Sequence, residues 1–207
     1  MAKEGFPFLI VTGLLTVVLF TLFSAFDLGA LAYLGGVTGV CFLALCLFFR
    51  DPERVIPAGE GVVVSAADGR VVGVREASGD IQVSVFLSIF DVHVNRIPFS
   101  GQVRAIQRRP GRFLFAFSGR ASAENEQVAV EIEHAGRTLV VKQIAGFVAR
   151  RIVCRATEGA QVRRGERFGM IKFGSRVDLI LPAGSEVRVR VGDRVRAGET
   201  IMGVIKT

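Results

Sequence analysis

Hydrophobic residues run almost without a break from Phe6 to Phe49, and the only charged side chain among them is Asp27. This run of about 44 residues is too long for one crossing of a bilayer core, which takes about 20 residues, and long enough for two. The pattern predicts two membrane-spanning helices, residues 6–26 and 31–49. A cleaved signal peptide is the alternative, but its apolar region spans only about 7–15 residues.

Basic residues flank this run on both sides. Lys3 precedes the first span, Arg50 and Arg54 follow the second, and the connecting loop has no basic residue. Because cytoplasmic flanks carry the excess of Lys and Arg, both termini are expected in the cytoplasm. The sequence thus predicts an anchor over residues 1–50 in the cell membrane and a soluble domain, 51–207, on its cytoplasmic face.

Short β segments separated by turn signals follow the anchor. Apolar runs on either side of Asp68-Gly69 predict a hairpin, and His134–Arg137 predicts another turn between strands. The best helical candidate is the stretch after Arg112, and its signal is weak. We therefore expect a mainly β, hairpin-rich and barrel-sandwich-like domain, preceded by an α-helical transmembrane hairpin.

One internal repeat supports this fold class. GAQVRRGERFGMI (159–171) and GDRVRAGETIMGVI (192–205) share G-x-x-V-R-x-G-E, and each reads as strand, glycine turn, strand. The pattern resembles the lipoyl and biotinyl carrier domains, which present a lysine at a hairpin tip. The expected tips here have no lysine, so carrier chemistry is not supported. A membrane-tethered adaptor domain of this shape, without catalysis, remains the alternative function.

The charge of the chain lies in the soluble domain. All but Lys3 and Arg50 of the 26 basic residues, and all but Glu4 and Asp27 of the 19 acidic ones, fall within 51–207, which therefore carries the net +7. Beside a bilayer this charge favours an anionic membrane surface. Nucleic acid is the rival partner, but the anchor argues against it, and one Tyr with no Trp leaves little for base stacking. Three cysteines without CxxC spacing and two histidines predict no metal site.

The candidates for chemistry are few. The chain has no GxSxG elbow and no glycine-rich phosphate loop with a lysine. What remains is Asp68 in its turn, His93 in FLSIFDVHVNRIP, and Gly174-Ser175. Alternation places His93 on the polar face of a strand, which fits either a cleft or a solvated surface. Gly174-Ser175 interrupts an apolar stretch, which fits a turn or a bulge.

A Gly-Ser pair also permits self-cleavage. The serine hydroxyl can attack the preceding carbonyl, and glycine suits that position because it has no Cβ and tolerates strain. β-Elimination then cuts the chain and leaves dehydroalanine, which loses ammonia to become a pyruvoyl group. That ketone forms a Schiff base with a substrate amine and accepts the electrons released when carbon dioxide leaves.

Six stretches follow one another along the chain: FFRDPER (48–54), SAADGRV (65–71), SIFDVHVNRIP (88–98), PGRFLFAFSGRASAENEQ (110–127), QIAGFVARRIV (143–153) and FGSRVDLILP (173–182). Together and in this order, they resemble the short branch of the phosphatidylserine decarboxylase family. The family decarboxylates phosphatidylserine to phosphatidylethanolamine. The resemblance implies cleavage between Gly174 and Ser175, giving a β chain (1–174) and an α chain (175–207) that stay together as a heterodimer, with the oligomeric state left open.

The resemblance also assigns roles. Ser175 would become the pyruvoyl group, Asp68 would serve the self-cleavage, and His93 would lie in the catalytic site. In one respect the chain departs from the longer branch, because Arg96 stands where those members have the histidine that pairs with the aspartate and serine. An arginine stays protonated and is no base, so either His93 covers both tasks or Asp68 acts more directly.

Substrate contacts are expected from arginine and aromatic residues. Arg96 would hold the lipid phosphate or the departing carboxylate. RRPGRFLFAF (108–117) offers Arg112 for the phosphate and Phe113, Phe115 and Phe117 for the membrane interface. A buried aromatic strand with a basic flank is the alternative for this stretch.

Overall fold

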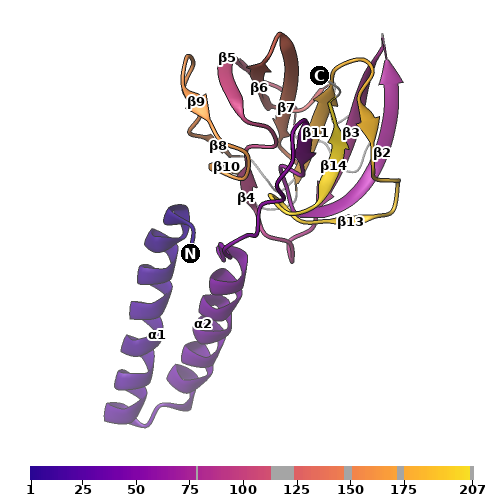
Figure 1. Ribbon diagram of the computed structural model, residues 1–207. Coiled ribbons are helices and arrows are strands. Elements are labelled where there is room, and N and C mark those ends of the chain that lie inside the picture. The colour runs from indigo at the N-terminus through magenta and orange to yellow at the C-terminus, as the bar shows by residue number, and fades with distance from the viewer. Residues whose placement is uncertain (78, 113–123, 147–150, 172–174, 206–207) are drawn as a thin grey trace. The chain divides into compact units, whose positions relative to one another are not determined.

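The computed structural model describes residues 1–77, 79–112, 124–146, 151–171 and 175–205 (Figure 1). The chain divides into two compact units, Met1–Pro52 and Glu53–Thr207. The first is helical and the second consists of β-strands, and each is described by itself.

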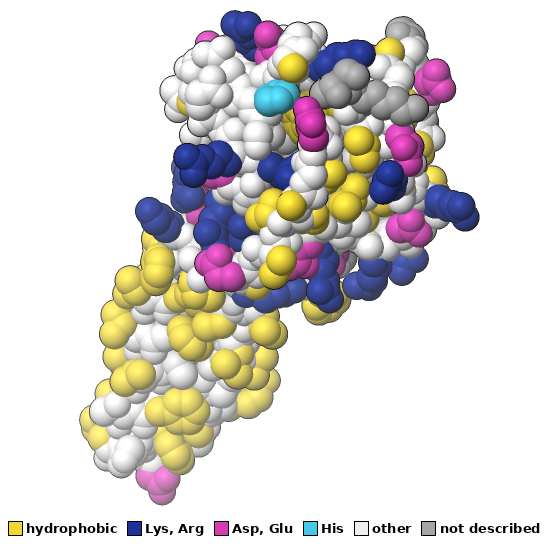
Figure 2. Space-filling view, in the orientation of Figure 1, with side chains coloured by type: hydrophobic (Ala, Val, Ile, Leu, Met, Phe, Trp, Pro, Cys, Tyr) yellow, Lys and Arg dark blue, Asp and Glu magenta, His cyan; other side chains and the backbone are white. Residues whose placement is uncertain are grey.

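The helical unit consists of a short 3-10 turn, η1 (Lys3–Gly5), and two helices, α1 (Phe6–Phe26) and α2 (Gly29–Phe48). Both helices are long and apolar enough to cross a membrane by length and composition. Twenty residues at 1.5 Å rise span about 30 Å, the thickness of a bilayer core. Hydrophobic side chains cover this unit in Figure 2, as expected for helices that face lipid rather than a protein core.

Small and hydroxyl side chains join the two helices. The Thr16 hydroxyl donates to that of Thr38 at 3.0 Å, and Gly35 leaves room for the ring of Phe20. Both features are common where helices pack in a membrane, because neither needs a hydrophobic driving force. The N-terminus is tied to the end of α2 by the Ala2 N–H, which donates to the Phe49 carbonyl at 2.8 Å.

In its described part, the second unit folds into three antiparallel sheets. An eight-stranded sheet has the order β13-β2-β3-β11-β7-β6-β5-β9, and two smaller ones have the orders β1-β14-β12 and β4-β10-β8. Figure 1 shows the long sheet curling around the smaller ones. The strands are β1 (Val62–Val64), β2 (Gly69–Ala77), β3 (Asp80–Leu87), β4 (Val94–Arg96), β5 (Gly101–Arg109), β6 (Gln127–His134), β7 (Arg137–Ile144), β8 (Ile152–Cys154), β9 (Gln161–Val162), β10 (Arg167–Ile171), β11 (Ser175–Leu181), β12 (Glu186–Val187), β13 (Arg194–Val195) and β14 (Ile201–Val204).

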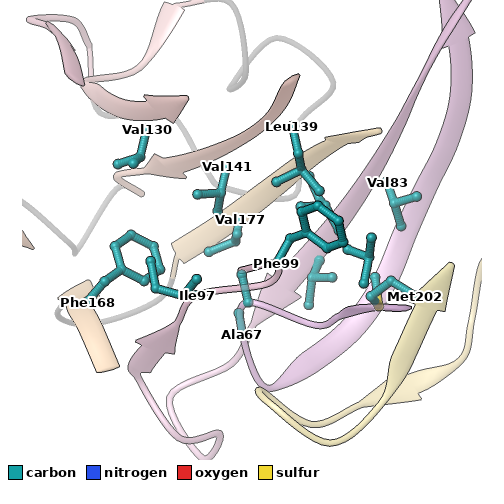
Figure 3. Close-up of a cluster of buried hydrophobic side chains, with 14 of the residues drawn as sticks. Ala67, Val83, Ile97, Phe99, Val130, Leu139, Val141, Phe168, Val177 and Met202 are labelled. Carbon is teal, nitrogen blue, oxygen red and sulfur yellow. The ribbon is translucent and has the colours of Figure 1, made fainter. Parts of the chain in front are cut away.

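The hydrophobic core lies between the long sheet and the two smaller ones (Figure 3). Strand alternation explains its composition. In β11, Val177, Leu179 and Leu181 face the core, whereas Arg176 and Asp178 lie on the opposite face of the sheet. The predicted fold class, a mainly β barrel-sandwich-like domain after an apolar helical hairpin, is confirmed.

One predicted hairpin is present and one is wrong. His134 pairs with Arg137 at the tip of the β6–β7 hairpin. The strands on either side of Asp68-Gly69 do not pair with each other, because β1 joins β14 and β2 joins β3. The chain instead crosses between sheets there. Glycine is needed at position 69 (φ +151°) for this close approach to β3, because a Cβ would lie 2.1 Å from the Phe86 carbonyl oxygen.

The internal repeat corresponds to two similar crossings between sheets. Its first copy contributes β9 to the long sheet and β10 to a small one, and its second copy contributes β13 and β14 in the same way. The two glycine turns also match: the Gly165 N–H donates to Ile97 O and the Gly198 N–H to Ser65 O, both at 2.8 Å. The helical candidate after Arg112 lies outside the described residues.

Candidate active site

Ser175 is the first residue of β11, in the middle of the long sheet. It lies opposite Leu87 of β3, and its side chain is fully buried on the same face as Val177. The Ser175 Oγ has no hydrogen-bond partner within the part of the chain that the structure describes. A buried hydroxyl normally finds a partner, so an unsatisfied one marks Ser175 as a candidate functional group.

Asp68 lies at the same end of the sheet. Arg70 lies opposite Phe86, so Gly69 is level with Leu87, on the other side of β3 from Ser175. Two strand spacings of about 4.8 Å put the Cα atoms of Ser175 and Gly69 roughly 10 Å apart. Asp68 directly precedes Gly69, so it lies at the same end of the sheet as the serine that it is expected to serve.

Three groups surround the Asp68 carboxylate. Arg54 donates to both oxygens at 2.9 and 2.8 Å, and the Ala197 N–H donates at 2.8 Å. Burial raises the pKa of Asp68, the Ala197 N–H and the Arg54 guanidinium oppose that rise, and the Asp91 carboxylate adds to it. A carboxyl whose pKa is raised toward neutrality is a better proton acceptor than an ordinary one when it is ionised.

His93 is completely buried, immediately before β4. Its ring Nδ1 bonds to the Asp91 carbonyl oxygen at 2.9 Å. The neighbouring side chains of Val92, Val94 and Asn95 are also buried. Of the two interpretations that the alternation left open, the solvated strand face is therefore excluded.

The segments that carry these three residues meet at one end of the domain. The Arg96 N–H donates to the Ala66 carbonyl at 2.9 Å, which ties the His93 segment to that of Asp68. Val94 pairs with Met170 of β10, so His93 lies level with Ile171. Four residues span at most about 14 Å, so Ser175 lies within that reach of Ile171.

A second buried polar pair lies nearby. Gln143 donates to the Asn95 side-chain oxygen at 2.8 Å and to the Val153 carbonyl at 3.3 Å. Gln143 is opposite Val177, two residues along β11 from Ser175. Gly169 makes room for this amide, because a Cβ there would lie 2.7 Å from the Gln143 Nε2.

The other expected site residues are placed differently. Arg96 is buried, and its guanidinium donates to the Gly165 carbonyl at 3.0 Å. This hydrogen bond holds the turn between β9 and β10. Arg112 is exposed beside Glu124, at 3.6 Å. Gly174 and Phe113, Phe115 and Phe117 lie outside the described residues. The substrate-binding roles of Arg96, Arg112 and Phe113 stay predictions.

Sequence reasoning missed several residues of the site. The role of Arg54 had one signal, its place in the FFRDPER stretch. Gln143 had the same kind of signal, as the first residue of QIAGFVARRIV, but its partner Asn95 could not be known from the sequence. On the outer face of the sheet, Arg176 donates to Asp178 and to the Ser84 hydroxyl, both at 2.6 Å. Both charged residues lie within the FGSRVDLILP stretch, but their pairing and burial required the fold.

The arrangement brings a buried serine hydroxyl, a carboxylate and an imidazole to one end of the domain, and groups of these three kinds are used in nucleophilic catalysis. The model of the family described as phosphatidylserine decarboxylase matches residues 42–203. The chain is 44% identical over 212 residues to the phosphatidylserine decarboxylase proenzyme of Geobacter metallireducens, covering 99% of this chain and 96% of that protein. It is equally identical to the proenzymes of Ruegeria pomeroyi (98% and 94% covered) and Magnetococcus marinus (100% and 95%).

The chain therefore belongs to the phosphatidylserine decarboxylase family. Its members are pyruvoyl-dependent carboxy-lyases, whose proenzymes acquire the pyruvoyl group by self-cleavage at a serine. A proenzyme of this kind yields an α and a β chain from one precursor. Membership also removes the non-catalytic adaptor as an alternative.

Proposed function

We propose that this protein decarboxylates phosphatidylserine to phosphatidylethanolamine, with a pyruvoyl group derived from Ser175. The observation that carries the proposal is the burial of Ser175 Oγ without a described partner, at the sheet end that Asp68 and His93 share, in a chain of this family. Cleavage between Gly174 and Ser175 gives a β chain of residues 1–174 and an α chain of residues 175–207.

Self-cleavage uses the chain's own atoms. The Ser175 Oγ attacks the Gly174 carbonyl carbon, so that an ester forms as the amide C–N bond breaks. Removal of the Ser175 Cα proton then breaks the Cβ–O bond, which releases the Gly174 carboxylate and leaves dehydroalanine. Water replaces its nitrogen, ammonia departs, and the ketone remains. This series of steps needs a base twice, once for the Ser175 hydroxyl proton and once for the Ser175 Cα proton.

Asp68 and His93 are the groups we assign to these proton transfers. Asp68 combines burial with a raised pKa, and its bidentate contact with Arg54 fixes its orientation. His93 is oriented by its contact with the Asp91 carbonyl. In the decarboxylation that follows, the pyruvoyl group would supply an electron acceptor, and we assign to His93 the delivery of the proton that replaces carbon dioxide.

The fold can hold the new end of the chain in place after self-cleavage. Ser175 heads a strand that pairs with β3 and β7 on both sides, so breaking the preceding bond leaves the new N-terminus held by two neighbours. The Arg176–Asp178 ion pair adds a buried anchor within the first residues of the α chain. The residues present therefore fit the group that the family requires.

The anchor and the charge fit a lipid substrate. We assign residues 1–50 to a membrane hairpin, with the domain 51–207 on the cytoplasmic face, because Lys3, Arg50 and Arg54 flank the spans. The net charge of +7 favours an anionic surface, and phosphatidylserine is itself anionic.

The proposal is tested by release of labelled carbon dioxide from phosphatidylserine that carries the label in its serine carboxylate. The detergent-purified protein should release it, and a Ser175→Ala variant should not. Phosphatidylethanolamine should accumulate in equal amount. Equal release from both proteins would contradict the assignment of Ser175, and no release from either would contradict the activity.

A further inference from the structure

Ile89 and Phe90 form an exposed apolar tip next to the candidate site. Their side chains are 55% and 79% exposed. Among the described residues of the β-rich unit, the other exposed large hydrophobic side chains, Val55 and Val191, are isolated in the sequence. Two adjacent large apolar side chains in water are unfavourable, which makes them a candidate contact surface.

The turn that carries this tip is rigid. The Asp91 carboxylate accepts from the Ser88 N–H at 2.8 Å and from its hydroxyl at 2.7 Å, and the Asp91 N–H donates back to Ser88 O at 3.0 Å. These bonds fix Ile89 and Phe90 at the two central positions. The protein therefore presents the tip in one conformation, which reduces the entropy lost on contact.

The same turn is joined to the catalytic residues. It begins directly after Leu87, which lies opposite Ser175, and its Asp91 carbonyl contacts the His93 ring at 2.9 Å. The tip is therefore next in the chain to the residues that contact or lie opposite the candidate catalytic groups.

Two arginines lie level with the end of β3 from which the turn begins. Arg70 is opposite Phe86 on β3, and on its other side it faces Arg194 of β13. Both arginines are exposed, and like charges directly opposite each other in a sheet are destabilising. A layer of negative charge would relieve that repulsion, so this edge of the domain suits an anionic partner.

We infer that the Ile89–Phe90 tip and the Arg70–Arg194 pair form the surface by which the domain docks on an anionic phospholipid bilayer, with the tip inserted among the acyl chains. An apolar tip next to basic side chains is the combination that a bilayer interface accommodates. This inference rests on the proposed function, because it assigns the route by which a lipid that stays in the bilayer reaches Ser175.

Tryptophan fluorescence tests the contact directly, since the chain has no Trp. A Phe90→Trp variant, reconstituted as the full chain in vesicles of phosphatidylcholine and phosphatidylglycerol, should be quenched by lipids brominated on their acyl chains. The control is Thr138→Trp, which is exposed on β7, six residues from Ile144 and therefore about 20 Å along the strand. Equal quenching of the two variants, or none at Phe90→Trp, would overturn the inference.

Turnover separates docking from chemistry. An Ile89→Ser/Phe90→Ser variant should cleave itself and decarboxylate a short-chain, water-soluble phosphatidylserine at the normal rate. On long-chain phosphatidylserine in the same vesicles, its decarboxylation rate should fall about tenfold, which is the order expected for one lost apolar contact. An Ile89→Leu/Phe90→Leu variant should retain both activities.

The two proposals fail in different ways. Equal losses on the short and long substrates would overturn the docking surface, as would full activity on both. If the unmodified protein released no carbon dioxide from either substrate, the proposed function would fail, while the quenching of Phe90→Trp would still decide whether the tip enters the bilayer.

Discussion

Arg54 and Asp68 form a bidentate ion pair, with both carboxylate oxygens within 2.9 Å of one guanidinium nitrogen. Both side chains are largely buried. Arg54 lies close after the predicted anchor, and Asp68 immediately precedes the strand that runs beside β3. The pair therefore fixes the carboxylate near Ser175 and limits the rise in its pKa that burial causes.

Replacing Arg54 with Gln should move self-cleavage to higher pH. Loss of the cation removes an interaction that lowers the pKa of Asp68, so the carboxyl stays protonated, and unable to act as a base, up to a higher pH. The cleavage rate of freshly synthesised protein, followed across a pH series, should show its acid limb displaced upward. Arg54→Lys should lie between Gln and the unmodified protein, because it keeps the charge but has a single nitrogen, which cannot contact Asp68 and Glu199 together as the Arg54 guanidinium does.

If the acid limb of the cleavage-rate profile is unchanged in a folded Arg54→Gln protein, Asp68 is not the base in the rate-limiting proton transfer. A limb displaced downward would contradict the sign of the electrostatic argument.

Substitution of His93 by Ala distinguishes its two roles. If His93 takes part in self-cleavage, the chain should remain whole. If it acts only on the substrate, the chain should divide into two but release no carbon dioxide. Because the His93 ring is fully buried, His93→Asn, which retains a polar group of smaller volume, serves as the control for a cavity. A cleaved and fully active His93→Ala protein would remove His93 from the site.

The Arg176–Asp178 pair should be important for stability. Removing one partner of a buried ion pair typically costs about 3–5 kcal/mol, since the other charge is left uncompensated. We expect Arg176→Met to lower the free energy of unfolding by that order, and Arg176→Met/Asp178→Leu to lower it by less. Denaturant unfolding in detergent measures this best in the Ser175→Ala background, where the chain remains in one piece.

The matched control is Arg104→Met, which breaks a solvent-exposed pair with Glu133 and should change stability little. A loss at Arg176→Met no larger than at Arg104→Met would contradict the importance of the buried pair.

Gln143 should stabilise the domain through its hydrogen bonds. Gln143→Leu keeps the volume but removes the donor to the Asn95 oxygen and the Val153 carbonyl. A buried acceptor left unsatisfied costs about 1–3 kcal/mol, which a thermal melt would detect. Asn95→Leu/Gln143→Leu should recover part of the loss, and a melting temperature unchanged in the single variant would show that water replaces the amide.

The pattern of hydrophobic and polar residues along the chain was sufficient to predict its broad architecture. The long apolar run, with Asp27 as its only charge, and the alternation in short segments are both local features of the sequence. The helices, the strands and the His134–Arg137 turn could therefore be predicted. The partner of each strand could not. Asp68-Gly69 reads as a hairpin locally, yet the chain crosses between sheets there because the contacts of Gly69 with Phe86 and of Asp68 with Arg54 are distant in sequence.

The candidate site divides in the same way. Ser175, His93 and Asp68 were identified from a family resemblance and from chemistry that a Gly-Ser pair permits. Their common position at one sheet end, the complete burial of His93 and the role of Arg54 required the fold. The sequence analysis assigned no role to Ile89 and Phe90, because their exposure depends on the turn closed by Ser88 and Asp91.

The central claim is that Ser175 is where the chain cuts itself, and the intact mass of the purified protein tests it most directly. Residues 175–207 are 33 of 207 residues, so about 3.5 of the 22.3 kDa. The unmodified protein should give two fragments, the smaller near that mass and blocked to N-terminal sequencing, while Ser175→Ala stays whole. A single full-length chain in both, with the native fold shown by circular dichroism, would contradict the account.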